Sequence, residues 1–123
     1  MQNDKEKFKK EFIQRLIKFS INNIQLAEIL KKQKAFYSLI DQLIRSSSSI
    51  GANVVEAKSS HSKKDYIKYF EIALKSANET KYWLAVIKEA YPNLKVIINK
   101  NLKENIEIAN ILASSVLTLK NKK

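Results

Sequence analysis

Polar side chains interrupt the apolar stripes of two predicted helices, and their types and spacing are the ones that could support chemistry. Asn53 and Glu56 lie three residues apart, as do Ser76 and Glu79, so each pair shares one face of its helix. Arg45 lies two helical turns before Asn53. These five side chains could form a hydrogen-bonded cluster where the two helices meet. We expect a buried polar network that fixes helix register or a subunit contact. A ligand-binding or catalytic role and simple exposure to solvent are the alternatives.

Residue patterns of the common enzyme classes are missing from the sequence. His61 is the sole histidine and falls in a predicted polar joint, where we expect it to be solvated. A di-iron bundle needs inward-facing glutamates and Glu-x-x-His pairs, and the serine run 46–49 has no visible base to activate a hydroxyl. The phosphate-binding patterns GxxxxGK[ST] and GxGxxG do not occur. The sequence therefore predicts a protein that is not an enzyme, with no catalytic residues, no metal site and no cofactor.

The charge of the chain is strongly positive: 23 Lys and Arg against 12 Asp and Glu give +11 at pH 7. Such an excess favours polyanions, chiefly nucleic acid, or an acidic partner or membrane surface. A lysine-rich background or a surface kept soluble by charge are the alternatives. Basic residues gather in the first turns of the chain and around its second joint. We predict nucleic-acid contacts at Lys5, Lys7, Lys9, Lys10, Arg15, Lys18, Lys58, Lys63, Lys64 and Lys68.

Two tyrosines, Tyr66 and Tyr69, lie among the lysines of the second joint. Lysine contacts to phosphates combined with tyrosine stacking would suit single-stranded or structured RNA. Tyr66 also falls on the apolar stripe of its helix, which favours a core position for it. Any binding here is expected to depend on the nucleic-acid backbone and on salt, and not on base sequence.

Length and composition bound the class of protein. A chain of 123 residues suffices for one domain with one modest core, so we expect a single domain over 1–123. One glycine and one proline leave few turns, which favours long helices and short joints. The absence of cysteine rules out disulfides and fits a reducing cytoplasm. The charged N-terminus lacks the core of a signal peptide, and no window resembles a membrane span. We expect a soluble, cytoplasmic protein without membrane contacts.

Apolar residues recur at steps of three and four along four segments, which is the signal of amphipathic helices. We predict helices over about 4–31, 34–56, 63–90 and 94–120. Their stripes contain Phe12, Leu16, Phe19, Leu26 and Leu30; Phe36, Ile40, Leu43, Ser47, Ile50 and Val54; Tyr66, Phe70, Ala73, Ala77, Thr80, Leu84 and Ile87; and Ile98, Leu102, Ala109, Leu112, Val116 and Leu119. Short joints force neighbouring helices to be antiparallel, so the predicted fold is an all-α, up-down-up-down four-helix bundle.

Several local signals refine this layout. The serine run 46–49 stays in register with the second stripe, so we favour a helix there over a linker. Gly51 costs up to ~1 kcal/mol in a helix interior, so a kink or an early end at this point is the alternative. Ser62 followed by Asp65 resembles a capping box. Pro92 ends the third helix, and Asn93 can cap the fourth. The first stripe is widened by isoleucines, which indicates more than one neighbouring helix.

The middle of the chain resembles the four-helix-bundle family first noticed as open reading frames in intervening sequences of bacterial 23S rRNA genes. The family pattern QLRRAAxSIPANIAEG corresponds here to QLIRSSSSIGANVVEA, and after a short polar joint K-E-F-I-R-F-L-x-I-A-x-G-S-x-x-E corresponds to the segment 64–79. The matching residues are Gln42, Leu43, Arg45, Ser49, Ile50, Ala52, Asn53, Glu56, Lys64, Asp65, Tyr66, Ile67, Lys68, Tyr69, Ile72, Ala73, Ser76 and Glu79. The chain departs from the pattern at Gly51, where the family has Pro, and at Ala57 and Lys75, where it has Gly.

The resemblance implies a cytoplasmic bundle whose relatives assemble as ring-like homopentamers and have no established enzymatic activity. It also implies kinship with the accessory variability proteins of diversity-generating retroelements, which are basic pentamers that bind a reverse transcriptase and nucleic acid. The main hypothesis is therefore a non-enzymatic homo-oligomer that binds nucleic acid, with RNA favoured, and that has a reverse transcriptase or another protein as a further partner. The alternative is a protein-interaction scaffold whose positive charge is incidental.

Overall fold

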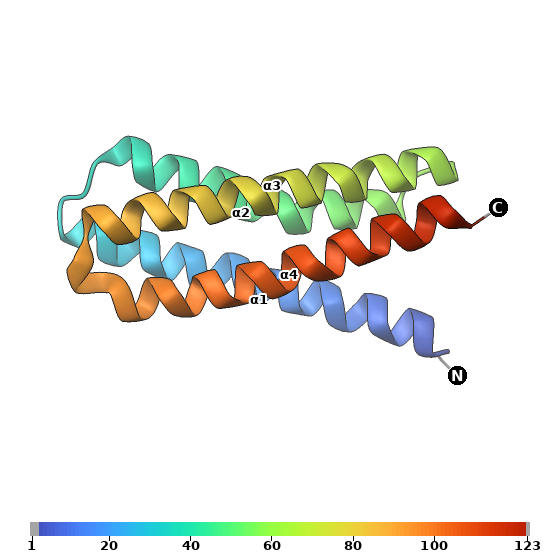
Figure 1. Ribbon diagram of the computed structural model, residues 1–123, viewed down its shortest axis with the longest axis horizontal. Coiled ribbons are helices and arrows are strands. Elements are labelled where there is room, and N and C mark those ends of the chain that lie inside the picture. Colours follow the sequence, from blue (N-terminus) through green and yellow to red (C-terminus); the bar gives the residue numbers. More distant parts are fainter. Residues whose placement is uncertain (1–2, 123) are drawn as a thin grey trace.

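The fold is a bundle of four long helices joined by short connections. This computed structural model describes residues 3–122. Its elements are α1 (Asp4–Lys32), α2 (Tyr37–Lys58), α3 (Lys63–Ala90), the short 3-10 helix η1 (Pro92–Leu94) and α4 (Lys95–Asn121). Consecutive long helices run in opposite directions, and both chain ends lie at the same end of the bundle (Figure 1). The prediction of an all-α four-helix fold is confirmed. Within residues 3–122, no helix is both long and apolar enough to cross a membrane.

Caps and turns explain where the helices begin. The Asn3 side chain accepts a hydrogen bond from the Glu6 backbone N at 2.8 Å, and Ser62 Oγ accepts one from the Asp65 N at 3.1 Å, as predicted for α3. The predicted start of α2 at residue 34 is wrong by three residues. Lys34 adopts a left-handed backbone conformation with φ of 57°, so it belongs to the turn that reverses the chain.

The predicted cap of α4 is also wrong, because Pro92–Leu94 forms a 3-10 turn before the helix begins. No side chain caps α4. Asn93 instead donates from Nδ2 to Gln33 Oε1 at 3.0 Å, which ties the two joints at this end of the bundle together.

The serine run and Gly51 lie within one continuous helix, so neither the linker nor the early end is formed. The hydroxyls bond to the preceding turn, as Ser48 Oγ does to the Ile44 carbonyl at 2.7 Å. A Cβ built on Gly51 would lie 3.4 Å from Leu16 Cβ on α1, which is ordinary van der Waals contact. The small residue marks a close approach of α1 and α2 that still has room for one methyl group.

We expect Gly51→Ala to raise the free energy of unfolding by about 0.5–1 kcal/mol, because alanine restricts the unfolded chain and fits the space beside Leu16. Urea or thermal unfolding followed by circular dichroism measures the change. The reverse substitution at the exposed neighbour, Ala52→Gly, should lower stability by a similar amount. Destabilisation by Gly51→Ala would show that the two helix backbones cannot separate by even a fraction of an ångström.

The core consists of two apolar clusters, one toward each end of the bundle. The cluster near the chain ends contains Phe12, Leu16, Phe19, Ile50, Val54, Ala57, Phe70, Ala73, Ala77, Ile108, Leu112 and Val116. The cluster near the η1 joint contains Leu26, Leu30, Leu43, Leu84, Ile87, Leu94 and Ile98. Most predicted stripe residues are therefore buried, and Phe36, which lies just before α2 and is exposed, is an exception.

A layer of buried polar residues separates the two clusters, and each helix contributes to it: Asn23, Ser46, Ser47, Thr80, Asn101 and Asn105. Asn23 donates to the Phe19 carbonyl at 2.9 Å and accepts from Asn101 Nδ2 at 3.2 Å, which joins α1 to α4. Asn105 donates to the Ala77 carbonyl at 2.9 Å, which joins α4 to α3. The predicted stripe of α4 is corrected here. Asn101, Asn105 and Ile108 are buried, whereas Leu102, Ala109 and Leu119 are only half-buried.

Candidate nucleic-acid interface

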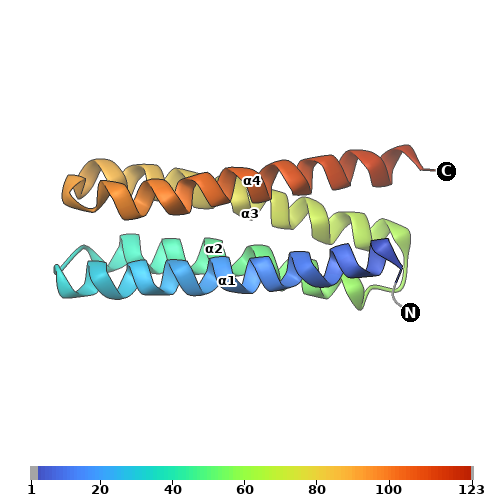
Figure 2. The same ribbon diagram turned by 90° about the horizontal axis from the view of Figure 1, so that it is seen from below.

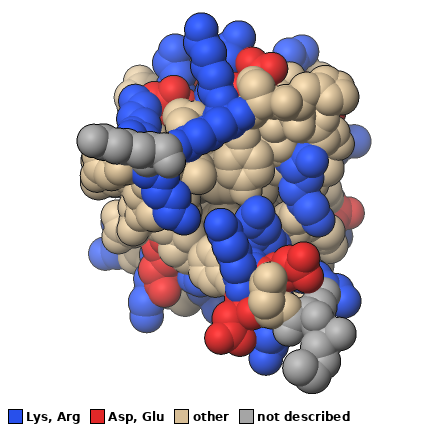
Figure 3. All heavy atoms as spheres, turned by 90° about the vertical axis from the view of Figure 1, so that its right-hand side faces the viewer, with Lys and Arg blue, Asp and Glu red and all other residues tan. Residues whose placement is uncertain are grey.

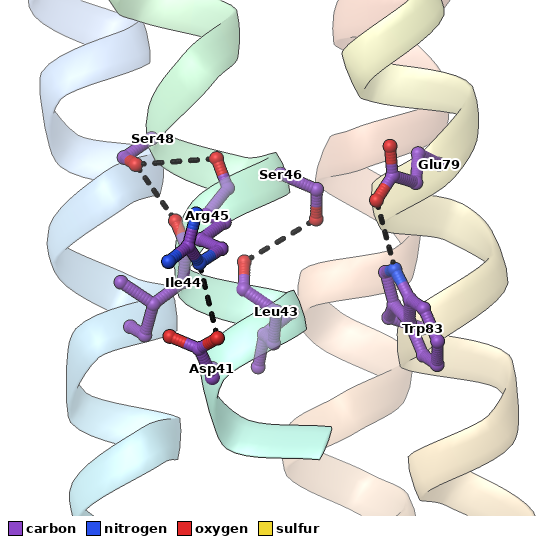
Figure 4. Close-up of polar contacts among 8 residues, drawn as sticks. All are labelled: Asp41, Leu43, Ile44, Arg45, Ser46, Ser48, Glu79 and Trp83. Atoms are coloured by element: carbon purple, nitrogen blue, oxygen red, sulfur yellow. Dashed lines mark hydrogen bonds and ion pairs between the residues drawn. The ribbon is translucent and has the colours of Figure 1, made fainter. Parts of the chain in front are cut away.

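The structure does not bring the five predicted cluster residues together, and Figure 4 shows two of them, Arg45 and Glu79, each bonded within its own helix. Arg45 is 74% exposed in its side chain and pairs with Asp41 on its own helix, Nε to Oδ2 at 3.0 Å. Glu79 is exposed and accepts from Trp83 Nε1 at 3.1 Å, also within one helix. Glu56 is exposed as well. Within one chain, Arg45, Asn53, Glu56, Ser76 and Glu79 therefore do not form a buried network, because Arg45, Glu56 and Glu79 are exposed.

A smaller polar contact forms at the same helix pair. Ser49 Oγ lies 3.0 Å from Ser76 Oγ across the interface of α2 and α3. Asn53 Nδ2 donates to Ser49 Oγ at 3.0 Å and to the Ser49 carbonyl at 2.8 Å. Two of the five predicted residues thus take part in a real contact, and its centre is a serine that the prediction omitted.

The two groups of lysines lie at the same end of the bundle, although they are far apart in the sequence. The first turns of α1, the end of α2, the start of α3 and the end of α4 all meet there (Figure 1). Figure 3 looks onto this end and shows lysine side chains on several sides of an uncharged central area. We call this surface the basic end. It comprises Lys5, Lys7, Lys9, Lys10, Lys58, Lys63, Lys64, Lys68, Lys120 and Lys122.

Two members of the predicted set lie outside the basic end. Arg15 makes a two-pronged ion pair with Glu104 on α4, with Nε–Oε2 and Nη2–Oε1 both 2.7 Å, and its Nη2 lies 3.4 Å from Glu107 Oε1. The hydrogen bonds that Arg15 donates to the Glu104 carboxylate raise the pKa of the Arg15 guanidinium above its already high value. Its charge is therefore neutralised by carboxylates and serves to join α1 to α4. Lys18 is exposed further along α1, away from the joint.

Carboxylates also occur at the basic end, but in smaller number. They are Asp4, Glu6, Glu11, Glu56, Asp65 and Glu71. Glu71 pairs with Lys120 at 2.8 Å and so neutralises one lysine. Lys63 Nζ donates to the Lys122 backbone carbonyl, which links α3 to the end of the chain. A net positive charge remains on this surface.

A hollow of about 240 Å³ opens at the basic end between the four helices. The aromatic side chains of Phe8, Phe12, Tyr66 and Phe70 line it, and Lys5, Lys9, Lys58 and Lys122 also contribute to its wall. The first turns of α1 diverge from the end of α4 in Figure 1, and the end of α4 lies apart from the start of α3 in Figure 2, so the bundle is open here.

The two tyrosines that sequence placed among the lysines are both half-buried against the core. Tyr66 stacks on Phe70 with ring centroids 5.0 Å apart, and Lys9 Nζ lies 5.4 Å from the centre of the Tyr66 ring. Tyr66 therefore belongs to the core and to the hollow at once.

Residues of α4 complete the hollow, and the sequence prediction missed them. Ser114, Ser115 and Thr118 line one wall, and Lys122 lies beside them. A serine pair and a threonine on a long helix carry no recognisable motif. The one available signal was topological, because an antiparallel bundle of four helices must place the end of α4 next to the start of α1.

An apolar groove lies along α1 and α2, on the side of the bundle. It is lined by Ile13, Leu16, Ile17, Ser20, Ile21, Ser48, Gly51, Ala52, Val55 and Glu56. Ile17, Ile21 and Val55 are about half exposed. The wide stripe predicted for the first helix therefore covers more of α1 than the core of one chain buries.

Within residues 3–122, no group of three or more His, Cys, Asp or Glu side chains is arranged so that it could hold a metal ion. His61 is exposed in the joint between α2 and α3, as expected.

Comparison with known proteins identifies relatives of unknown function. The family model described as 23S rRNA-intervening sequence protein matches residues 9–114. A crystal structure from Bacteroides thetaiotaomicron, described as a protein with unknown function from the S23 ribosomal protein family, is 31% identical to this chain. The similarity covers 85% of this chain and 97% of that chain, with a TM-score of 0.79. No curated protein matches this chain.

Proposed function

The chain belongs to the family of 23S rRNA-intervening sequence proteins, and on that premise we propose that it is a non-enzymatic, cytoplasmic protein that binds RNA through its basic end. One observation carries the proposal. Two lysine groups separated by about fifty residues lie on the same end of the bundle, where lysines outnumber carboxylates. A surface of this kind attracts a polyanion whose phosphates it can neutralise together.

The geometry also supports RNA over a merely acidic partner. Lysine is a point charge on a long stem and contacts phosphates without demanding one geometry. The lysines here surround aromatic side chains. If the protein were a scaffold with incidental charge, this arrangement would have no explanation. The description of the family refers to 23S rRNA, which makes RNA the first polyanion to test.

A salt titration tests the proposal. Binding of the protein to a structured RNA and to a DNA duplex of equal length is measured between about 50 and 300 mM salt, with the mass in solution determined on the same sample. We expect a linear fall of log K with log salt, with a slope of about −0.7 to −0.9 for each phosphate neutralised. A well-formed protein that binds neither polymer at ~100 mM salt contradicts the proposal and leaves the protein-interaction scaffold as the better explanation.

The same measurement of mass addresses assembly. We propose that the groove along α1 and α2 packs against a further copy of the chain, because its exposed isoleucines and Val55 would otherwise remain in water. A homopentamer is the assembly expected from the resemblance. Further partners, a reverse transcriptase among them, would then contact the assembled protein. A monomeric mass at micromolar concentration would rule out assembly through this groove without affecting RNA binding.

A further inference from the structure

Three types of side chain line the hollow at the basic end: aromatic, hydroxyl-bearing and basic. Together they match the chemical groups of a nucleotide. The inner part of the hollow is aromatic, with Phe12 and Phe70 buried beneath Phe8 and Tyr66. One side is formed by Ser114, Ser115 and Thr118, three residues whose side chains carry hydroxyls. Lysines also line the hollow: Lys5 and Lys9 from α1, Lys58 from the end of α2, and Lys122 after the end of α4. Flat apolar faces, hydrogen-bonding edges and adjacent phosphates are the three features of a nucleotide.

We propose that this hollow receives a single unpaired base of the bound RNA. The inference rests on the proposed function, and it adds that unpaired RNA is preferred to a perfect duplex. The volume of about 240 Å³ is far larger than one water molecule needs, so a flat ring system can enter the hollow. A base inside a duplex is stacked on both faces and cannot enter, whereas a bulged or looped base can.

Two details of the wall favour a base over an alkyl chain of equal size. An alkyl chain would remove the three α4 hydroxyls from water without offering them a hydrogen bond, which is unfavourable. A base offers ring nitrogens and exocyclic groups at its edge. The Phe8 ring stacks on Phe12 at 6.0 Å on one side and is 51% exposed, so it leaves surface on which a base can stack.

Lysine positions fit the same arrangement. Lys9 already lies over the Tyr66 ring at 5.4 Å, which holds a positive charge directly above the aromatic wall. Lys5 follows one turn before it on α1, and Lys58 faces the hollow from the end of α2. A base in the hollow would therefore place its flanking phosphates within reach of lysines from two helices.

The test compares three RNAs of matched length: a duplex with one bulged adenosine, the same duplex with an abasic bulge, and the fully paired duplex. We expect the bulged adenosine to bind about tenfold or more tightly than the abasic bulge, as stacking on aromatic side chains provides. With 2-aminopurine at the bulge, fluorescence should fall on binding, because the base stacks on a protein ring.

A pair of phenylalanine variants assigns the effect to the hollow. Phe8→Ala should remove most of the difference between the bulged and abasic RNAs. Phe36→Ala changes an exposed phenylalanine at the other end of the bundle, where it is 74% exposed, and should leave the difference intact. Both residues are solvent-exposed, so circular dichroism should show folded protein for each variant. A further variant, Thr118→Val, removes one hydroxyl at nearly constant shape. It should lower the affinity for the bulged adenosine and leave the affinities for the abasic and fully paired RNAs unchanged.

The outcomes separate this inference from the proposed function. Equal affinity for all three RNAs, with equal salt slopes, would overturn the base site while leaving RNA binding in place. Failure of every RNA to bind at ~100 mM salt would contradict both. Saturable binding of decanoate that Phe8→Ala abolishes and that the bulged RNA does not displace would assign the hollow to an alkyl chain and would overturn the base site as well.

Discussion

Replacing Lys5, Lys9, Lys58 and Lys64 together with glutamine is expected to weaken RNA binding by roughly 100-fold at ~100 mM salt and to reduce the salt slope by up to about 3. Two of these lysines come from α1, one from α2 and one from α3, and the ends of these helices meet only in the folded bundle. If each contacts a phosphate, each loss removes one released counterion. The dissociation constant measured across a salt series gives both the affinity and the slope.

The opposite end of the bundle offers a matched control. Lys31, Lys32, Lys95 and Lys100 are exposed there, and changing them to glutamine removes the same net charge. We expect this control set to lower affinity by only a few-fold, through the weaker long-range field. Equal losses from the two sets would show that net charge alone attracts RNA and that the basic end is not a binding surface.

A second large effect is expected in the polar layer of the core, where Asn23 and Asn101 form a buried pair between α1 and α4. Asn101→Leu leaves the Asn23 oxygen without its donor, and Asn23→Leu leaves the Asn101 amide without its acceptor. Each single change is expected to cost about 1–3 kcal/mol, because a buried polar group loses its partner. The double change removes both groups and should be closer to the wild type than either single variant.

Urea unfolding of the four proteins gives the coupling energy directly. A coupling of about 1 kcal/mol or more in favour of the pair supports the role assigned to this contact. Additive effects of the two changes would show that the asparagines act independently. The double variant also tests whether the polar layer fixes the register of the helices, because helices packed through apolar residues alone can shift along one another or repack. Loss of a single solution mass, or of cooperative unfolding, would be the sign of such slippage.

The helices could be predicted from the sequence because helix formation depends largely on residues that are close together in the chain. Apolar residues at steps of three and four, few glycines and prolines, and the Ser62 cap placed all four helices within three residues of their observed ends. The family resemblance was visible for the same reason, since its two blocks are contiguous in the chain. Errors arose where a local pattern had two solutions. Asn93 resembles a helix cap, but its side chain donates to Gln33 instead. In α4, Asn101 and Asn105 are buried, and a search for apolar residues alone overlooks them.

The candidate site depended on contacts that no local pattern contains. Arg15 resembles its lysine neighbours in sequence, but Glu104, which is 89 residues away, neutralises it. Arg45 and Glu79 look close on two adjacent helices, yet the rotation of each helix about its axis points them away from one another. The α4 hydroxyls join the aromatic hollow only because the last helix returns to the first.

By itself, then, the sequence determined the four helices, their antiparallel order, the family and an excess of positive charge. Periodicity, short joints and composition are properties of neighbouring residues, and they act before any distant contact forms. Only the tertiary structure decided which lysines share a surface, which charge is neutralised and where the bundle opens. Those outcomes depend on how far each helix turns and spreads against its neighbours, and packing across the whole bundle sets both.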